Sequence, residues 1–328
     1  MSDRFYLVTG ATGFIGSALV RALLANGNHV RALDDESRGS RARLQDVESE
    51  IDWMPGDVRD ITQVEHAVRG MDAVCHLAAV NGTEFFYSRP ELVLEVAVKG
   101  MVNVLEACIK HGVGELFVAS SSEVYQTPPE VPTDETVPLS IPDPLNPRYS
   151  YGGGKIISEL LTLNYGRNKL QRAVIFRPHN VYGPDMGWEH VIPQFAVRMD
   201  ELCKDTQGPV VFPIQGTGAE TRSFVFIDDM IAGLLKVIEK GEHMSIYHVG
   251  TDDETSIREL AEQTASFFGR EIRIAPGALQ PGGTLRRCPN IRKLRQLGYE
   301  PVVSLKQGLA ATIPWYIQNR NKQPSHNP

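Results

Sequence analysis

Tyr151 and Lys155 stand one helical turn apart in "YSYGGGKIISELL", a segment with the character of a helix. A tyrosine normally loses its proton at about pH 10, so by itself it is a poor base near neutral pH. An ammonium group one turn away stabilises the phenolate and should lower the pKa of the tyrosine. The pair therefore predicts a base for proton abstraction, although exposed helix residues would satisfy the same spacing.

A second group of polar residues closes a segment that reads as a buried strand. In "FVASSSEVY" the apolar residues are followed by Ser120, Ser121, Ser122 and Glu123. A serine hydroxyl there could hydrogen-bond the substrate oxygen that gives up its proton to Tyr151. The carboxylate of Glu123 could remove a further proton. Alternatively, Glu123 has a structural role and hydrogen-bonds the loop that follows it.

The segment "VTGATGFIG" places Gly10, Gly13 and Gly16 between a predicted strand and an amphipathic helix. Glycines allow a tight turn and close approach of the backbone to a pyrophosphate, whose charge the helix N-terminus attracts. The spacing is G-x-x-G-x-x-G rather than the more frequent G-x-G-x-x-G, and an ordinary turn would also explain three glycines. The context nevertheless predicts a dinucleotide site, and an oxidised nicotinamide would add positive charge beside Tyr151.

Acidic residues end the next two predicted strands. Asp34 follows Gly16 at close to the spacing of about 20 residues at which a carboxylate accepts the ribose hydroxyls of a dinucleotide. A carboxylate there repels a 2′-phosphate, so NAD is favoured over NADP, and the nearby Arg38 weakens that preference. Asp57, in "GDVRD", lies where an adenine ring could bind, or where a turn simply contains an aspartate.

These residues need a framework that brings strand ends together. Short β-branched segments predict strands at 5–10, 29–34, 51–57, 72–79, 115–121 and 172–178. Helical periodicity appears between them, as in 15–27, 91–112 and 154–168. Because the apolar character of the strands is nearly continuous, they predict a parallel sheet covered on both faces, a doubly wound α/β (Rossmann) fold. The linker 127–148 contains seven prolines and is expected to be an irregular surface loop.

Beyond residue 180, turns rich in glycine and proline interrupt the pattern, and helices are predicted at 256–269 and 304–319. This part predicts a smaller, C-terminal mixed α/β domain that binds the substrate. We assign residues 1–178, and with them 222–250, to an NAD-binding Rossmann domain. Residues 179–221 and 251–322 form the second domain, and 323–328 are expected to be a disordered tail.

The composition excludes several classes of protein. The chain has 328 residues, 42% hydrophobic and 22% charged, and a net charge of -7 without the clustered basic face that nucleic acid requires. The four cysteines contain no C-x-x-C pair and the nine histidines show no metal-ligand spacing, so neither disulfides nor a metal are predicted. With no signal peptide and no apolar run of about 18 residues, we expect a cytoplasmic protein without membrane contact.

Taken together, these motifs resemble those of the NAD-dependent sugar-nucleotide epimerase/dehydratase family, within the extended short-chain dehydrogenases/reductases. They are, in order, "TGATGFIG", Asp34, "HLAA" (76–79), "SSSEVY" (120–125), Tyr151-x-x-x-Lys155, "RPHNVYGP" (177–184) and "TRSFVFIDD" (221–229). The resemblance runs from about residue 4 to residue 320. It implies that tightly bound, recycled NAD oxidises a nucleotide-diphosphate (NDP) sugar at C4 to a ketone, on which the enzyme then acts.

The resemblance also implies roles for individual residues. Tyr151 is the base, Lys155 its electrostatic partner and ribose anchor, and Ser121 the hydroxyl that contacts the substrate oxygen. The implied cofactor-binding residues are Gly10, Thr12, Gly13, Phe14, Ile15, Gly16, Asp34, Asp57, Val58, Leu77, Ala78, Ala79, Tyr151 and Lys155. Asn180, Arg222, Arg286 and Arg287 are expected to contact the nucleotide and its phosphates, with surface salt bridges as the alternative for the arginines.

Ser122 and Glu123 bear on the reaction. Once C4 is a ketone, the C5 hydrogen is acidic, and its removal by Glu123 would start loss of water across C5–C6. A uronic acid would instead become a β-keto acid and lose carbon dioxide. Members of the family that dehydrate or decarboxylate resemble this chain, with Thr-Asp-Glu or Thr-Ser-Glu before Val-Tyr, whereas 4-epimerases generally have small neutral residues there.

The leading hypothesis is therefore C4 oxidation followed by C5 chemistry, either 4,6-dehydration or decarboxylation. The segment "RRCPNIRKLRQLGYEP" (286–301) resembles UDP-glucuronate decarboxylases, whereas "HVIPQF" (190–195) resembles hexose epimerases and dTDP-glucose dehydratases. The alternatives are an NDP-sugar 4-epimerase, a non-catalytic NAD-binding regulator and an NADPH-dependent ketoreductase. The segment "DMGWEHV" (185–191) is the predicted place of substrate selection.

Three features depart from the family pattern. Gly152–Gly154 fill the interval between tyrosine and lysine, Ala97 stands where asparagine is usual, and Gln126 stands where glycine is usual. Because each glycine costs about 1 kcal/mol of helix propensity against alanine, the helix is expected to begin loosely or to be shaped around the ligand. The family usually forms a homodimer through a four-helix bundle, which 91–112 and 154–168 could build, although packing within the chain could use the same apolar surface.

Overall fold

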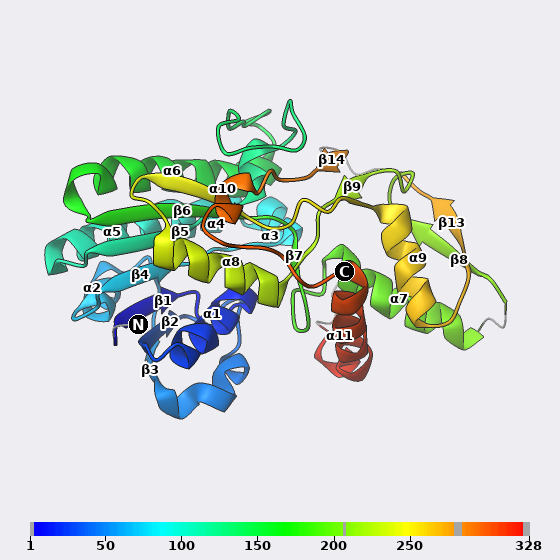
Figure 1. The fold of residues 1–328 in the computed structure, drawn as a ribbon, viewed down its shortest axis with the longest axis horizontal. Coiled ribbons are helices and arrows are strands. Elements are labelled where there is room, and N and C mark those ends of the chain that lie inside the picture. The colour runs from blue at the N-terminus through cyan, green and yellow to red at the C-terminus, as the bar shows by residue number, and fades with distance from the viewer. Residues whose placement is uncertain (1–2, 206–207, 279–283, 324–328) are drawn as a thin grey trace.

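The computed structural model describes residues 3–205, 208–278 and 284–323. Its largest element is a seven-stranded sheet in the order β11-β6-β5-β4-β1-β2-β3, in which all neighbours are parallel. The strands are β1 (Phe5–Thr9), β2 (His29–Asp34), β3 (Ile51–Pro55), β4 (Ala73–His76), β5 (Glu115–Ala119), β6 (Arg172–Pro178) and β11 (Ser245–Val249). This sheet, with helices on both sides, confirms the predicted doubly wound α/β fold (Figure 1).

Helices cover both faces of the sheet because its strands are apolar on both faces. Leu7 belongs to one buried cluster and its neighbours Tyr6 and Val8 to another, since successive side chains of a strand point in opposite directions. Helix α1 (Phe14–Ala25) packs beside α8 (Ile227–Lys240) on one face, and α2 (Ile61–Val68), α5 (Gly100–His111) and α6 (Ser150–Lys169) pack together on the other (Figure 1).

The predicted helix 91–112 is built from three consecutive pieces. They are α4 (Pro90–Leu94), a π-helical turn η2 (Glu95–Lys99) and α5, which ends at His111 and is capped by Gly112 with a φ of 72°. A glycine in this left-handed conformation is a frequent helix terminator. The short elements nearby are η1 (Arg41–Glu50), α3 (Thr83–Ser88), η3 (Ser122–Tyr125) and η4 (Pro147–Tyr149).

Helix α6 carries Tyr151 and Lys155, and the glycine triplet does not loosen its start. The helix begins at Ser150, and Gly152–Gly154 are helical and buried. A β-carbon on Gly154 would lie 2.8 Å from Cβ of Ala97, so the absence of a side chain allows α6 to lie close to η2. Ala97 and Gly154, two departures from the family pattern, are therefore packing partners.

Most of the second part of the chain extends beyond one end of the sheet, whereas its short helix α10 (Arg292–Arg295) packs against β11 and α8 (Figure 1). Its other helices are α7 (Val191–Asp205), α9 (Ile257–Phe267), α11 (Leu305–Gln318) and η5 (Arg320–Lys322). Its small sheets pair β7 (Val181–Tyr182) with β10 (Val225–Phe226), β8 (Val210–Ile214) with β13 (Ile272–Pro276), and β9 (Thr221–Arg222) with both β12 (Thr255–Ser256) and β14 (Arg286–Arg287). Between these segments the chain returns to the large sheet through α8 and β11.

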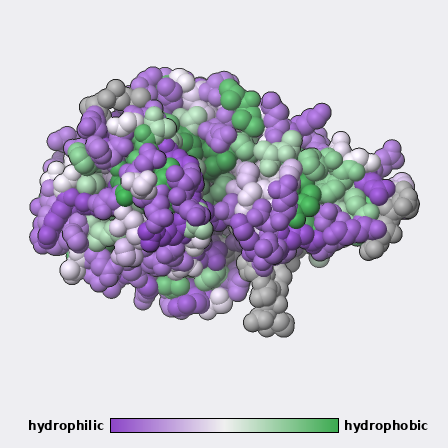
Figure 2. Space-filling view, turned by 90° about the horizontal axis from the view of Figure 1, so that it is seen from below, coloured by the Kyte–Doolittle hydropathy of each residue, from purple (hydrophilic) through white to green (hydrophobic). Residues whose placement is uncertain are grey.

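The linker 127–148 contains no helix or strand apart from the first residues of η4 and an isolated bridge between Thr133 and Pro289. Of the predicted tail, residues 324–328 lie outside the described part of the chain. No helix among the described residues is long and apolar enough to cross a membrane. Hydrophilic residues cover most of the face in Figure 2, and hydrophobic residues appear there in smaller groups.

Candidate active site

Most strands of the large sheet bring a site residue to its carboxyl edge. Gly10 follows β1, Asp34 ends β2, Leu77 follows β4, Ser120 follows β5 and Pro178 ends β6. Ligands of doubly wound folds bind in the crevice at this edge, where the connections on the two sides of a strand diverge. Two adjoining cavities occupy it, a smaller one of about 100 Å³ and a larger one of about 470 Å³.

The glycine-rich turn after β1 fits a dinucleotide pyrophosphate. Gly10 has a φ of 70°, and a β-carbon there would lie 2.7 Å from the backbone nitrogen of Ala78. A β-carbon on Gly16 would lie 2.0 Å from the carbonyl oxygen of Gly10. Gly10 and Gly13 line both cavities, and the first turn of α1, with Phe14, Ile15 and Gly16, lines the larger one. The helix N-terminus thus borders the space that a pyrophosphate would occupy.

Asp34 lines the smaller cavity, and protein groups already bond both of its oxygens. Its Oδ2 accepts from the Thr12 amide at 2.9 Å and its Oδ1 from the Glu36 amide at 2.8 Å. Burial raises the pKa of Asp34 even though these hydrogen bonds oppose the shift. Thr12, predicted to contact the cofactor, lines neither cavity and instead holds this carboxylate.

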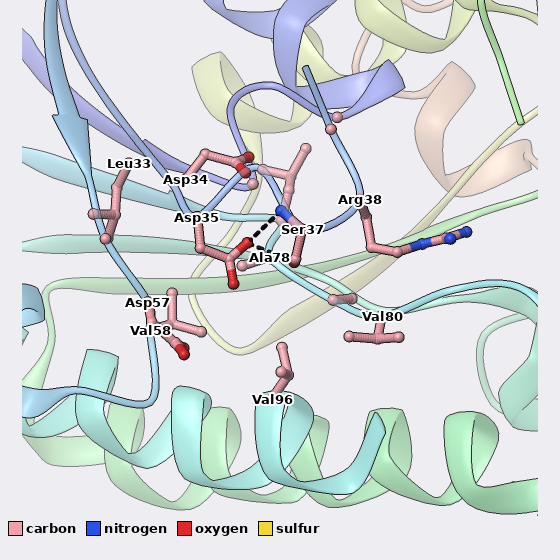
Figure 3. Close-up of a pocket in the computed structure, with 16 residues that line it drawn as sticks. Leu33, Asp34, Asp35, Ser37, Arg38, Asp57, Val58, Ala78, Val80 and Val96 are labelled. Carbon is pink, nitrogen blue, oxygen red and sulfur yellow. Dashed lines mark hydrogen bonds between the residues drawn. The ribbon is translucent and has the colours of Figure 1, made fainter. Parts of the chain in front are cut away.

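Sequence reasoning missed Asp35, which is more exposed than Asp34 and lines the same cavity. Its Oδ1 accepts from the amide of Ser37 at 3.0 Å and from the Ser37 hydroxyl. In Figure 3 the Asp35 carboxylate lies at the space that Val58, Val80 and Val96 also border. The two adjacent aspartates at the end of β2 could have indicated Asp35 as a ribose-binding residue, since either carboxylate can accept a hydrogen bond from a ribose hydroxyl.

Asp57 lines the smaller cavity together with Val58, Ala78 and Ala79, three other residues that were expected to contact the cofactor. Its carboxylate is bonded by the side chain of Arg59, at 2.7 Å from Nη2, and Arg59 also pairs with Glu95 at 2.9 Å. Burial raises the pKa of Asp57, but the hydrogen bonds and charge of Arg59 outweigh burial and lower it. The aspartate is therefore both a wall of the cavity and the anchor of a turn.

Tyr151 and Lys155 both line the larger cavity. The Lys155 ammonium nitrogen lies 5.9 Å from the centre of the Tyr151 ring and donates a hydrogen bond to the Ala119 carbonyl at 2.6 Å. Phe86 stacks on the Tyr151 ring with the ring centres 5.1 Å apart. These contacts fix the orientation of the tyrosine at one wall of the cavity.

The pKa values of this pair differ from the expectation. Burial raises the pKa of Tyr151 to about 12; a hydrogen bond with Ser121 opposes this shift and the charge of Glu123 adds to it. Burial lowers the pKa of Lys155 to about 8. Burial thus outweighs the lowering of the Tyr151 pKa that the lysine was expected to cause.

The three serines after β5 have different surroundings. Ser121 caps η3 by accepting a hydrogen bond from the Glu123 amide at 3.2 Å, and both Ser121 and Ser122 line the larger cavity. Ser120 donates to Glu159, which forms an ion pair with Arg177 at 2.6 Å. All three serines line the larger cavity, but Ser120 is also tied to this almost completely buried ion pair, whereas Ser121 and Ser122 are not bonded to it.

Glu123 forms an ion pair with Arg287, 164 residues further along the chain. Nη1 of Arg287 lies 2.6 Å from Oε1 of Glu123, and both residues line the larger cavity. Arg287 also donates to the Thr284 hydroxyl at 3.0 Å. Burial raises the pKa of Glu123, but the charge and hydrogen bond of Arg287 outweigh it, so the pKa lies below its ordinary value and Glu123 is ionised.

The other residues predicted to contact the substrate differ in whether they line the larger cavity. Asn180 lines the larger cavity, with a φ of 38° and its side-chain amide bonded to the Ser223 carbonyl. Arg222 does not line it, and its guanidinium donates to the carbonyls of Thr221 and Thr284, both at 2.7 Å. Arg286 is exposed, pairs with Glu254 at 2.7 Å and lines neither cavity. Arg286 thus forms the surface salt bridge that was the alternative to a phosphate contact.

Two ion pairs connect the loop after β2 and the short helix η1 to the predicted selection segment 185–191, and sequence reasoning missed both. Nε of Arg43 lies 2.8 Å from Oδ2 of Asp185, and Arg43 also donates to the Thr12 carbonyl at 3.0 Å. Arg38 pairs with Glu189 at 3.4 Å and lines both cavities. These contacts join the edge of the dinucleotide site to the second part of the chain.

No three histidine, cysteine, aspartate or glutamate side chains in the described ranges are grouped so that they could hold a metal ion. The described cysteines, Cys75, Cys108, Cys203 and Cys288, are all free. The chemistry of the site therefore rests on the tyrosine, lysine, serines, glutamate and arginines around the larger cavity.

The fold and the site define an NAD-dependent enzyme of the short-chain dehydrogenase/reductase class. Residues 6–250 match the NAD dependent epimerase/dehydratase family, and the chain belongs to this family. The predicted family, enzyme class and cofactor are thereby confirmed. The family-level function is confirmed with them, because its relatives act on nucleotide sugars as epimerases, dehydratases and decarboxylases.

Individual relatives show how varied these reactions are. The chain is 33% identical to UDP-glucose 4-epimerase of Mycolicibacterium smegmatis, covering 96% of this chain and 98% of that one. It is 29% identical to UDP-N-acetyl-alpha-D-glucosaminuronate decarboxylase of Bacillus cytotoxicus, with the same coverage. A crystal structure of dTDP-glucose 4,6-dehydratase from Streptomyces venezuelae with NAD bound is similar at a TM-score of 0.84 and 32% identity, covering 97% and 98% of the two chains.

Proposed function

We propose that the enzyme decarboxylates a nucleotide-diphosphate hexuronate after NAD-dependent oxidation at C4. The observation that carries this proposal is the ion pair of Glu123 with Arg287 in the wall of the cavity that Tyr151 also lines. An arginine there can exchange its bond with Glu123 for a bond with the carboxylate of the sugar. The similarity to a glucosaminuronate decarboxylase supports a uronate substrate.

Ser122 distinguishes decarboxylation from dehydration. Loss of the C6 hydroxyl as water needs an acid that protonates the leaving oxygen. Ser122, between Ser121 and Glu123 in the sequence, lines the cavity with both of them. A serine hydroxyl is too weak an acid to protonate the leaving oxygen. Glu123 is ionised through Arg287 and cannot supply the proton either. Decarboxylation of a β-keto acid requires no such acid.

Individual residues of the chain have different roles in the two steps of the reaction. Tyr151 takes the proton of the C4 hydroxyl, Ser121 bonds the same oxygen, and the Lys155 ammonium stabilises the phenolate. When bound, NAD accepts the hydride from C4. With a ketone at C4, the C5–C6 bond breaks, its electron pair enters the enolate and carbon dioxide leaves, after which C5 takes a proton. The negative charge of Glu123 disfavours the carboxylate in the ground state and favours its departure.

The second candidate is a 4-epimerase, which the identity of 33% with the Mycolicibacterium smegmatis enzyme favours. Epimerisation needs the same tyrosine, lysine and serine but leaves C5 and C6 unchanged. Under this alternative, Glu123 serves only to hold Arg287 and the loop that contains it.

Proton NMR of the purified protein with NDP-sugars in deuterated water separates these functions. The panel contains UDP-glucuronate, UDP-N-acetylglucosaminuronate, UDP-glucose and dTDP-glucose. We expect a uronate to lose its carboxylate and yield a pentose, or its 4-keto form, with deuterium at C5. A C4-inverted sugar that keeps its C5 proton would identify an epimerase, and a deuterated C6 methyl group would identify a dehydratase.

The role of Glu123 has its own test. With Glu123→Gln we expect product formation to fall below detection while transient reduction of bound NAD persists, because C4 oxidation needs only the tyrosine, lysine and serine. Absorbance at the wavelength of reduced nicotinamide reports the first step, and NMR reports the product. Unchanged turnover of this variant would remove Glu123 from the mechanism.

The proposal extends to the organisation of the protein. Residues 1–178 with 222–250 would form the NAD-binding domain, and 179–221 with 251–322 the substrate-binding domain. Leu94, Ile157 and Leu160 are exposed on α4 and α6, at 37%, 39% and 55%, and would form the core of a homodimer interface. Sedimentation equilibrium of the wild type and of Leu160→Glu tests this interface. Reduced cysteines would place the enzyme in the cytoplasm.

A further inference from the structure

Arg148 enters the larger cavity from an element that sequence reasoning treated as the end of a surface loop. It lies in η4, which runs directly into α6, three residues before Tyr151. The Asn146 side chain accepts a hydrogen bond from the Arg148 amide at 3.0 Å and so caps this short helix. The position of the arginine is therefore tied to the helix that carries the proposed base.

The arginines of the larger cavity differ in their partners. Arg38 bonds the Asn81 carbonyl at 2.7 Å, Arg43 pairs with Asp185, and Arg287 pairs with Glu123. The Arg148 side chain has no hydrogen bond or ion pair within the described ranges, and its Nε is buried without a partner. A guanidinium that loses water without gaining an anion is costly, so a ligand that supplies the anion would bind there favourably.

The place of Arg148 indicates which anion this is. Its positive charge acts on Glu123, where it helps to lower the pKa of that carboxyl group. Glu123 and Tyr151 mark the reacting end of the sugar, whereas the diphosphate of the substrate is attached at C1, at the opposite end. The carboxylate on C6 of a hexuronate is the negative group at the reacting end.

We infer that Arg148 is a specificity-determining residue that binds the C6 carboxylate of the substrate and so selects uronates over neutral hexoses. This inference rests on the proposed function. Arg148, unlike Arg287, has no bond with Glu123 to exchange, so it can supply the positive charge that a third negative group of the ligand, beyond the two of the diphosphate, would need. Its planar guanidinium can donate two parallel hydrogen bonds to a carboxylate, whereas a hydroxymethyl group offers no matching acceptor pair.

The test measures equilibrium binding without turnover. In a Tyr151→Phe parent loaded with NAD, calorimetry gives the dissociation constants of UDP-glucuronate and UDP-glucose, and the same is done with Arg148→Gln added. We expect UDP-glucuronate to bind about 10- to 100-fold more weakly to the added variant, and UDP-glucose to change less than about threefold, since one charged hydrogen-bonded pair is lost. Arg148→Lys should retain part of the preference, and Arg167→Gln, on the exposed face of α6, should retain all of it.

Each other outcome has a definite meaning. Equal weakening of both ligands by Arg148→Gln would overturn the inference, because it would place the arginine on the diphosphate. An unchanged preference would overturn it as well. A parent that binds UDP-glucose as tightly as UDP-glucuronate would overturn the proposed function and the inference with it. The NAD content of each purified variant verifies that it has folded.

Discussion

A β-carbon on Gly152 would lie 2.6 Å from Nε2 of Gln126. The same Nε2 donates to the Glu123 carbonyl at 2.6 Å, and Gln126 has a left-handed φ of 54°. Two residues that depart from the family pattern thus fit each other, because the glycine leaves the space that the glutamine side chain fills. Gln126 in turn accepts a hydrogen bond through its carbonyl from Thr284, which is bonded to Arg287.

We expect Gly152→Ala to lower both stability and turnover, although alanine is the better helix former. The clash with Gln126 should cost about 1–3 kcal/mol, more than the roughly 1 kcal/mol that alanine gains in a helix. Urea unfolding and turnover are measured for this variant and for Gly152→Ala with Gln126→Gly, which should recover much of the loss. Gly153→Ala is the matched control, because its β-carbon would meet only the flexible end of Ile141 at 3.3 Å. A Gly152→Ala variant as stable as this control would contradict the packing argument.

The ion pair of Glu123 with Arg287 should show energetic coupling. Arg287→Met leaves the mostly buried Glu123 carboxylate without its partner, whereas in a Glu123→Gln background the same change leaves only a neutral amide. We expect Arg287→Met to cost about 2–4 kcal/mol more in the wild type than in that background. A double-mutant cycle by urea unfolding of the NAD-free proteins gives this difference. Equal costs in both backgrounds would show that the pair contributes no net coupling.

The pair of Arg43 with Asp185 should retain bound NAD. It joins η1 and, through the Thr12 carbonyl, the glycine-rich turn after β1 to the segment that borders the larger cavity. We expect Arg43→Ala to speed NAD dissociation at least about tenfold. In this variant the segment around Asp185 can move away from the NAD site without breaking a bidentate, partly buried ion pair. Stopped-flow displacement of NAD measures the rate. Arg41→Ala removes an arginine of the same short helix whose partner is Glu48, and it should leave the rate unchanged. Similar rates for both variants would contradict the prediction.

Substitution of the two aspartates at the end of β2 should affect stability and NAD affinity differently. Asp34 is buried and bonds two backbone amides, so Asp34→Asn is expected to lower stability as well as NAD affinity. Asp35 is exposed in the same cavity, so Asp35→Asn should weaken NAD binding with the free energy of unfolding nearly unchanged. Calorimetric titration with NAD and urea unfolding of the NAD-free protein give the two quantities. Full NAD affinity in Asp35→Asn would leave Asp34 as the ribose contact.

Stability should depend on pH through Lys155. Burial lowers its pKa from 10.5 to about 8 in the folded protein, so between these pH values the unfolded chain binds more protons than the folded one. Stability therefore rises with pH in this window, with a slope of at most about 1.4 kcal/mol per pH unit from this group. Urea unfolding of NAD-free wild type and Lys155→Met should show a difference that grows from pH 8 to pH 10.5 in favour of the wild type. Parallel curves would mean that the folded lysine keeps its ordinary pKa.

The sheet and the cofactor site could be predicted because their signals are local. The segment 29–34 has apolar residues at 30, 32 and 33, follows a predicted helix and ends in an aspartate, and these properties together indicate β2 and the place of Asp34. Tyr151 and Lys155 could be found in the same way, since four residues of one helix fix their separation. The strand ends then meet at one edge because all the strands are parallel.

Contacts between distant segments could not be predicted in this way. Nothing near Glu123 in the sequence indicates Arg287, and the two segments meet in space, where Thr284 bonds both the Gln126 carbonyl and Arg287. Arg148 stands at the end of a proline-rich linker, where its sequence neighbours indicate only a loop. The lowered pKa expected for Tyr151 was also a local argument, and burial by Phe86 and the surrounding core reverses it.

The contact between Glu123 and Arg287 also limits how this enzyme could have diversified. Glu123 is encoded in the part of the gene that specifies the large sheet, and Arg287 in the part that specifies the C-terminal segment. Neither part alone encodes both members of the ion pair. Recombination that joined this sheet to the C-terminal segment of a relative without the arginine would leave an unpaired acid beside the substrate. New specificities in such a lineage would arise by stepwise substitution at both places rather than by exchange of whole segments.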